Sequence, residues 1–409
     1  MTKGGGCDSG GRGLQASPLD ELHDMVSCGD WLTARSALET FLAAHEAVHD
    51  GYRNVIARIL SSVLTTFGQD AVEQLNEAHA TWEALSPLMS LPPRDLVRRI
   101  ADVNHWHMSR FRVIEDAEKV MFLLQPCGSG GRLINEGRYY VTEDRPYALM
   151  PRASPSTFAT ADFPVYCNHC SEMSRTILKG GGHGWLIEGW TPDHRFGGCR
   201  LHVFKSFANV SGEFFTRLQL SAPTARPSET DERWFSADEL TELSTPASTQ
   251  LRKALDLQDA TTASALIATA KAAWEGGLLP AYKGWVTELY ASILQAYGPD
   301  VFADMFRDTV FDLFSKAQEM AGRGMPEHAW EHYWRCQGGL LGTSSAPARR
   351  ILRISATSLF APGARAEPLR RATGHLCNSF NSRLGGRGPG TASMLQNDAG
   401  DLVMHVTLS

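Results

Sequence analysis

The chain has 409 residues, a formal net charge of -6 at pH 7 and 43% hydrophobic residues, as in an ordinary globular protein. This mild negative charge offers no basic surface for nucleic acid and no polybasic anchor for a membrane. No run reaches the roughly 18 apolar residues of a membrane span. The Gly/Ser-rich residues 1–16 lack the apolar segment of a secretory signal, so we expect a disordered lead-in and a cytoplasmic protein.

The N-terminal third of the chain is predicted to be helical. Ser17 precedes Pro18 and two acidic residues, which is typical of a helix start. Apolar side chains then recur at three- and four-residue steps up to Gly68, a residue that favours a helix end. We therefore expect helices over residues 31–67, 71–88 and 94–110.

The middle of the chain is predicted to combine short strands with one helix. A helix is expected from Cys167 to Lys179. The expected strands cover residues 111–113, 120–124, 185–190 and 199–204, and the last two form an antiparallel hairpin. Residues 221–249 are rich in Pro, Ser, Thr and acidic residues, which indicates a linker. Residues 250–325 are again predicted to be helical.

The second half of the chain resembles a diverged copy of the first. Tyr52–Asp70 (YRNVIARILSSVLTTFGQD) aligns without gaps with Tyr282–Asp300 (YKGWVTELYASILQAYGPD). Two dipeptides match further on: Cys167-Asn168 with Cys377-Asn378, and His202-Val203 with His405-Val406. Amphipathic helices resemble one another by chance, but the shared Gly-x-Asp ending favours duplication. We expect an α/β (α+β) fold of two tandem, diverged copies, residues 17–220 and 250–409, each a helical segment followed by a small antiparallel sheet.

A cysteine-rich segment organises the first copy. Cys167 and Cys170 form a Cys-x-x-Cys pair, and Cys199 and His202 form a later Cys-x-x-His pair. Zinc takes four tetrahedral ligands and favours thiolates. We therefore expect zinc at the three cysteines, with Glu188, His202 or Cys127 as the fourth ligand; the alternative is a set of buried or redox-active thiols without metal. The second copy lacks counterparts of Cys170 and Cys199.

The same segment resembles the 4-vinyl reductase-like small-molecule-binding domain. That family has an upstream cysteine and then Glu-x-x-Cys-x7-Cys before a final strand. Glu188 and Cys199 stand at the spacing of its glutamate and last cysteine, with Cys167 or Cys170 as the upstream cysteine. Thr191 replaces the middle cysteine, so the family's zinc site is incomplete unless another cysteine contributes. The resemblance implies an α/β fold with a zinc-pinned flap beside a buried pocket for a small, often aromatic, ligand.

A second candidate zinc site is the sequence HEAVH. His45 and His49 are four residues apart on a predicted helix, where they could hold zinc with Glu46 as general base. Glu77 could serve as a third ligand. This pattern indicates a zinc hydrolase; the alternative is a solvated helix face, and the second copy keeps neither histidine.

Further candidates lie around two short segments, NHWHMSRF and PCGSGGRL. Histidine is suited to acid–base chemistry near neutral pH, and a nearby arginine with backbone amides would favour a cysteine thiolate. The alternatives are a core segment anchored by tryptophan and a tight structural turn. The candidate catalytic residues are His105, His107 and Cys127, and the candidate substrate-binding residues are Trp106, Arg132 and Trp185.

These features predict a zinc-containing enzyme of the hydrolase or lyase type that acts on a small organic molecule, with aromatic molecules as one option. The first alternative is a non-catalytic small-molecule sensor or binding protein of the vinyl-reductase-like type, and the second is the HExxH hydrolase. The expected partner is a small-molecule ligand or substrate, with no nucleic acid or membrane and with a homodimer as an option.

Overall fold

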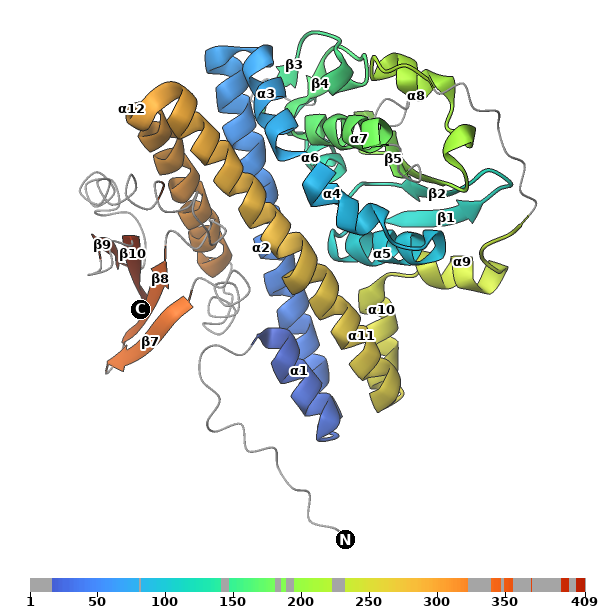
Figure 1. The fold of residues 1–409 in the computed structure, drawn as a ribbon. Helices are drawn as coiled ribbons and strands as arrows, with labels where there is room; N and C mark the ends of the chain where they lie inside the picture. Colours follow the sequence, from blue (N-terminus) through green and yellow to red (C-terminus); the bar gives the residue numbers. More distant parts are fainter. Residues whose placement is uncertain are drawn as a thin grey trace. The chain divides into compact units, whose positions relative to one another are not determined.

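The computed structural model describes residues 17–80, 82–140, 147–180, 185–188, 195–222, 232–322, 340–346, 349–355, 369, 391–396 and 402–408 (Figure 1). The fold is mostly helical with small antiparallel sheets. None of the helices in these residues combines the length and the apolar character needed to cross a membrane. The chain separates into two compact units, Met1–Val55 with Ser248–Ser409, and Ile56–Ala247. The second division falls inside the predicted linker, and the first falls within a long helix.

The first unit contains the N-terminal helices and those after residue 247. They are α1 (Pro18–Ser27), the first part of α2 (Trp31–Phe67), α10 (Ala247–Asp256), α11 (Ala260–Ala273), the π-helical turn η5 (Trp274–Leu278) and α12 (Leu279–Gly322). The Ser17 side chain caps α1 by accepting a hydrogen bond from the Asp20 amide at 3.1 Å. Inside α12, Gly298 interrupts the helix with φ 84° and ψ 176°, in the region of positive φ that favours glycine.

A four-stranded antiparallel sheet also belongs to the first unit. Its strands are β7 (Leu340–Ala346), β8 (Arg349–Ser355), β9 (Thr391–Gln396) and β10 (Leu402–Leu408), in the order β7-β8-β10-β9. β10 lies between β8 and β9, and His405 pairs with Arg353 on one side and Ser393 on the other.

The second unit surrounds another four-stranded antiparallel sheet. Its strands are β1 (Phe111–Glu115), β2 (Lys119–Leu124), β5 (Trp185–Glu188) and β6 (Cys199–Phe204), in the order β1-β2-β6-β5. Every second residue of β2 is buried: Val120, Phe122 and Leu124. This alternation is the pattern of a strand with one face on the core. A two-stranded sheet pairs β3 (Leu149–Met150) with β4 (Phe163–Pro164).

Helices contact both edge strands of this sheet. The helices of the unit are α3 (Gln69–His79), α4 (Trp82–Met89), α5 (Pro93–Trp106), α6 (Gly130–Asn135), α7 (Asn168–Gly180), α8 (Gly212–Arg217) and α9 (Ala237–Ser244). α7 packs against β5 and α9 packs against β1, while α3 and α4 pack against α7 (Figure 1). α7 follows a short 3-10 turn, η2 (Val165–Cys167).

One buried ion pair fastens the segment before α9 to the sheet. Lys205 Nζ lies 2.8 Å from Glu115 Oε1, and the two side chains are 2% and 1% exposed. The Glu115 carboxylate also accepts hydrogen bonds from the backbone amides of Trp234 at 2.6 Å and Phe235 at 3.0 Å. Lys205 Nζ donates to the Glu232 carbonyl oxygen at 2.6 Å. Both charges are therefore satisfied inside the protein.

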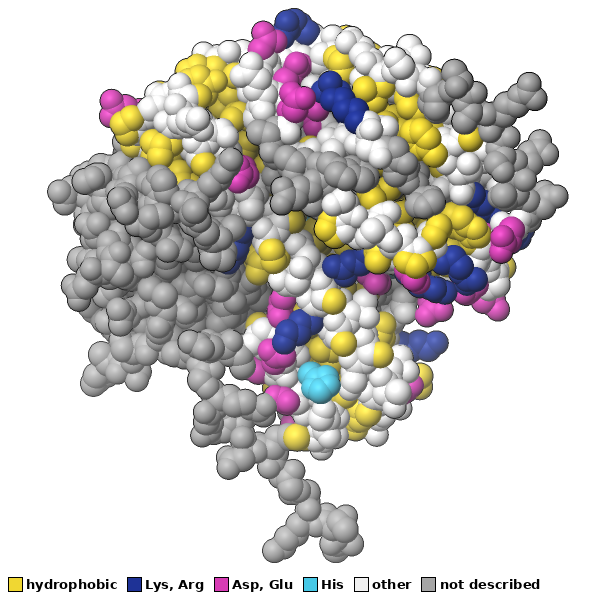
Figure 2. Space-filling view, in the orientation of Figure 1, with side chains coloured by type: hydrophobic (Ala, Val, Ile, Leu, Met, Phe, Trp, Pro, Cys, Tyr) yellow, Lys and Arg dark blue, Asp and Glu magenta, His cyan; other side chains and the backbone are white. Residues whose placement is uncertain are grey.

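Charges on the surface are mixed in sign. On the face in view in Figure 2, Lys and Arg side chains lie beside Asp and Glu side chains. In the second unit, for example, Arg94 and Arg98 both pair with Glu239, at 2.8 and 3.2 Å. Such pairs keep the local potential small.

Most predicted elements are confirmed. The helix over residues 31–67, the helix that follows Cys167 and the antiparallel hairpin before Lys205 are all present. The helix predicted over residues 71–88 is instead two helices. Ala80 separates them with φ -82° and ψ 56°, and its carbonyl oxygen accepts a hydrogen bond from Thr176 Oγ1 at 2.6 Å.

Asp102 on α5 is expected to make stability depend on pH. Burial raises the pKa of its carboxyl to about 6, against the lowering effect of Arg99. Because the pKa is higher in the folded than in the unfolded state, the folded protein loses stability as the pH rises from about 4 to about 6. Asp102→Asn is therefore expected to raise the free energy of unfolding by about 1–3 kcal/mol at pH 7.5, and by much less at pH 4.5. Urea denaturation at both pH values measures this; equal effects at both would contradict it.

Candidate functional site

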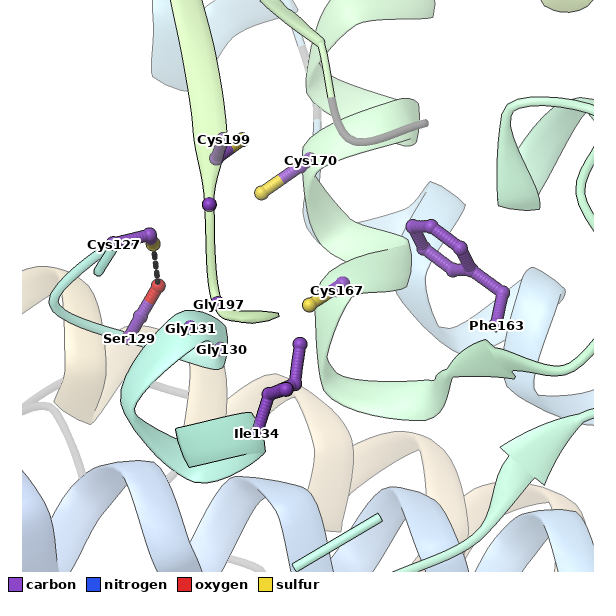
Figure 3. A pocket seen from close by; sticks show the side chains of 11 residues that line it. Cys127, Ser129, Gly130, Gly131, Ile134, Phe163, Cys167, Cys170, Gly197 and Cys199 are labelled. Atoms are coloured by element: carbon purple, nitrogen blue, oxygen red, sulfur yellow. Dashed lines mark hydrogen bonds between the residues drawn. The ribbon is translucent and has the colours of Figure 1, made fainter. Parts of the chain in front are cut away.

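Four cysteines line one small cavity of the second unit (Figure 3). Cys127 follows β2, Cys167 ends η2, Cys170 lies in the first turn of α7, and Cys199 begins β6. The cavity has a volume of about 30 Å³, and a cavity needs only about 10–15 Å³ to hold one water molecule, so an atom-sized ligand has room. In Figure 3 the sulfur atoms of Cys170 and Cys199 point toward one another, and that of Cys167 is turned toward the same space. Four distant segments thus bring thiols together.

Glycines allow the walls of this cavity to approach closely. A Cβ atom at Gly130 would lie 2.4 Å from Cys167 Sγ, and one at Gly131 would lie 2.2 Å from the carbonyl oxygen of Gly197. Gly197 itself has φ +77°, and its carbonyl oxygen accepts a hydrogen bond from the Cys127 amide at 2.9 Å. The first part of PCGSGGRL is a turn, as predicted, and its last four residues begin the short helix α6, which packs closely against Gly197.

A buried polar network holds the start of α7 in place. Asn168 has no exposed surface, donates to the Ser156 carbonyl oxygen at 2.5 Å and is hydrogen-bonded to Asn76. Further along the helix, Ser174 Oγ accepts a hydrogen bond from the Ile187 amide of β5 at 3.2 Å. Because buried polar groups need partners, this network fixes the helix on which Cys170 lies.

Burial makes the thiols poor acids. Burial raises the pKa values of Cys167, Cys170 and Cys199, and the charges of the neighbouring cysteines raise them further. Cys127 Sγ lies 3.2 Å from Ser129 Oγ. Among the residues described, no group of three or more His, Cys, Asp or Glu side chains is arranged to hold a metal ion. The four thiols fit zinc by number and chemistry, and a cation at their centre would offset the repulsion among thiolates.

Glu188 and His202, two further predicted ligands, bond to each other. His202 Nε2 lies 2.7 Å from Glu188 Oε2, and the His202 ring stacks on Phe204. Burial raises the pKa of Glu188, but the hydrogen bond and charge of His202, with Arg200, outweigh burial and bring that pKa below its usual value. Neither side chain lines the cysteine cavity, although Cys199 Sγ donates to the Glu188 carbonyl oxygen at 3.3 Å. Of the three residues considered for the fourth ligand, Cys127 is the one that lines the cavity.

The predicted catalytic histidines lie at the end of α5. His105 Nε2 donates to the Leu243 carbonyl oxygen at 3.0 Å, and its ring stacks on Phe111 with centroids 4.6 Å apart. Burial lowers the pKa of His105 to about 4, so the ring is neutral near pH 7. Trp106 is 3% exposed, and His107 follows it as the C-cap of α5. In the cavities described here, none of the three residues lines a wall.

The other predicted pocket residues are dispersed. Arg132 Nη1 lies 3.1 Å from Met108 Sδ. Trp185 begins β5, and its side chain is outside the described part of the chain.

The HEAVH residues belong to the helical core of the first unit. His45 and His49 are 2% and 0% exposed, whereas Glu46 is exposed on the other side of α2. The His45 ring meets Trp274 edge-on at 4.3 Å, and the His49 ring meets Tyr282 at 5.7 Å. The two histidines therefore pack among aromatic rings.

A larger cavity in the second unit was not foreseen from the sequence. It has a volume of about 740 Å³ and is lined by Ser61, Thr65, Tyr140, Tyr147, Ala148, Leu149, Pro151, Asp162 and Arg195. The Arg195 guanidinium lies 5.9 Å above the Tyr140 ring, and Tyr140 Oη donates to the Asp162 carbonyl oxygen at 3.1 Å. Its residues come from four separate stretches, so no sequence motif marks it.

Comparison with known proteins adds no relative. No family model, curated protein or solved structure matches the chain. The resemblance to the 4-vinyl reductase-like domain thus stays a prediction.

Proposed function

We propose that Cys127, Cys167, Cys170 and Cys199 bind one zinc ion in a structural site. The observation that carries this proposal is the convergence of four thiols, from four separate segments, on one cavity of atomic size. A zinc ion with four thiolate ligands has no open position for water or substrate, which is typical of structural sites. The ion would hold α6, α7 and β6 together.

A closed site favours the ligand-binding function over the hydrolase or lyase. Activation of water by zinc requires an open coordination position, and four thiolates would occupy all positions. We therefore propose that the protein binds a small organic molecule beside a zinc-stabilised sheet, and that the metal takes no part in chemistry.

Elemental analysis of the purified protein tests the zinc site. We expect one zinc per chain in the wild type and its loss in Cys170→Ser, because a serine hydroxyl does not replace a thiolate ligand. The matched control is Cys377→Ser, which changes the cysteine aligned with Cys167 in the second half and should keep the metal. Loss of zinc in His45→Ala but not in Cys170→Ser would instead support the HExxH hydrolase.

The larger cavity supports binding of an aromatic ligand with an anionic group. At about 740 Å³ it is within the range of small-molecule sites. Arg195 could pair with a carboxylate, and the Tyr140 and Tyr147 rings could pack against an aromatic ring. Arg195 also precedes the glycines that line the cysteine cavity, so one short segment contributes to both cavities.

Calorimetric titration with a panel of small aromatic acids tests this site. For any acid that binds, Arg195→Gln is expected to weaken binding roughly 10- to 100-fold, the effect of losing one charge-assisted hydrogen bond. Arg217→Gln, a change in an ion pair on α8, is the control and should bind as the wild type does. If the wild type and Arg195→Gln bind the acid with equal affinity, the acid does not bind beside Arg195 in the larger cavity.

We also propose that the chain arose by tandem duplication. The two four-stranded sheets support it, because both have the first two strands as a hairpin and the fourth strand between the second and the third. His202 and His405, which match in sequence, lie in corresponding strands, β6 and β10. Gly68, with φ 86° and ψ 178°, and Gly298, with φ 84° and ψ 176°, share one unusual backbone conformation. The second sheet has Leu402 where β6 begins with Cys199.

A further inference from the structure

The helices of the first unit repeat at a constant interval. Tyr52 and Tyr282 are 230 residues apart, and so are Gly68 and Gly298. The same interval places α1 on α10, and α2 on α11 and the first part of α12, to within one residue at the start of each. The chain thus contains two equivalent pairs of helices, a short one followed by a long one, and the first unit includes both pairs except for the part of α2 after Val55.

Equivalent residues meet at the centre of these helices. Tyr52 and Tyr282 stack on each other with ring centroids 5.5 Å apart and an interplanar angle of 9°. Both are buried, at 1% and 4% exposure. A residue contacts its own counterpart only on or near a twofold axis, as at the interface of a symmetric dimer. The stacked tyrosines therefore mark a local pseudo-twofold axis within one chain.

Each short helix packs against the long helix of the other copy. α1 packs against α11, and Lys271 Nζ forms an ion pair with Asp20 Oδ1. Between the other two helices, Arg252 of α10, two residues beyond the counterpart of Asp20, binds the Glu39 carboxylate of α2 through two contacts, at 2.6 and 2.8 Å. The short helix of each copy therefore packs on the long helix of the other, which is the exchange of contacts that a twofold axis produces.

The HEAVH histidines take part in the same interface. His45 contacts Trp274 and His49 contacts Tyr282, so both rings from the first copy pack on residues of the second. The two histidines therefore have a packing role in the interface between the copies, whereas Glu46 is exposed.

We infer that the C-terminal copy takes the place of a partner subunit, so that the helical pairing that would join two chains of a homodimer is completed inside one chain. The inference rests on the proposed duplication and is independent of zinc. His45, His49 and Tyr52, which contact the second copy, are buried within one chain and are therefore not accessible to another molecule. One chain then has two structural halves, and the second lacks counterparts of Cys170 and Cys199 in its sequence.

Zero-length cross-linking of the full-length protein tests the inference. A carbodiimide joins a carboxylate to a lysine amine only when they are in contact, and the Asp20–Lys271 pair is 45% exposed on both sides. We expect the Asp20–Lys271 peptide in the band that migrates as one chain on a denaturing gel. Lys271→Arg, which keeps the charge but forms no amide, should lose this peptide and so confirms its assignment.

Two results would overturn the inference. Recovery of the Asp20–Lys271 peptide from a two-chain band would show that the helices pair between chains, in a domain-exchanged homodimer. Absence of the peptide from every band would show that α1 does not lie on α11. Either result leaves the zinc content untouched, so failure here is distinguishable from failure of the proposed metal site.

Discussion

Replacement of Cys170 with serine is expected to remove the zinc and to lower the free energy of unfolding by several kcal/mol. The binding of structural zinc contributes about 10–16 kcal/mol to small zinc-dependent peptides, and this protein has in addition an apolar core around β2. The variant should therefore remain folded at low temperature but unfold more readily. Thermal unfolding followed by circular dichroism, with and without a chelator, measures the effect.

The chelator supplies the comparison that isolates the metal. Wild type stripped of metal should unfold at the temperature of Cys170→Ser, and the chelator should leave that variant unchanged. The control Cys377→Ser should behave as the wild type in both conditions. If the wild type and Cys170→Ser unfold alike before the chelator is added, the thiols do not hold a stabilising metal.

Replacement of Glu115 with glutamine is expected to lower the free energy of unfolding by about 3–5 kcal/mol, because it leaves the Lys205 ammonium buried without a counter-charge. The amide can still accept one of the two backbone hydrogen bonds from Trp234 and Phe235. The decrease in the free energy of unfolding therefore arises mainly from the unpaired charge of Lys205. Urea denaturation at pH 7.5 measures it.

An exposed ion pair provides the matched control. Glu213→Gln breaks the pair with Arg217, in which the side chains are 59% and 33% exposed, and should change stability by less than about 1 kcal/mol. The double variant Glu115→Gln/Lys205→Met should recover part of the loss, because no buried charge is left. A Glu115→Gln effect as small as that of Glu213→Gln would mean that water reaches Lys205.

Local patterns predicted most of the secondary structure. In α2, apolar residues recur at three- and four-residue steps and Gly68 follows the end, so the helix over residues 31–67 could be predicted from a local pattern. At the break, the Ala80 carbonyl oxygen accepts a hydrogen bond from Thr176, which is distant in sequence, and a local pattern contains no information on such a contact. The glycine-rich turn was predicted, and Gly128 and Ser129 form one, but the short helix from Gly130 was not, because glycines disfavour helices. Close packing against Cys167 and Gly197 requires glycines there.

The candidate site was predicted only in part, for a related reason. Cys-x-x-Cys spacing marks Cys167 and Cys170, and the hairpin pattern brings in Cys199. The choice among Cys127, Glu188 and His202 depends on the side chain that reaches the cavity, which is a property of the packed sheet. In the sheet, Glu188 of β5 pairs with Arg200 of β6, and His202 pairs with Leu186. Glu188 and His202 are therefore diagonal neighbours, and their side chains bond to each other.

The segment from Arg195 to Cys199 has a thermodynamic consequence. Arg195 lines the larger cavity, and Gly197, Gly198 and Cys199 line the smaller one. If a ligand in the larger cavity and a metal in the smaller one both order this segment, their binding free energies are coupled. Linkage then requires reciprocity: the factor by which the metal strengthens binding of the ligand equals the factor by which the ligand strengthens binding of the metal. A higher metal concentration would therefore raise the occupancy of the larger cavity by the ligand, and a higher ligand concentration would raise the occupancy of the cysteine site by the metal.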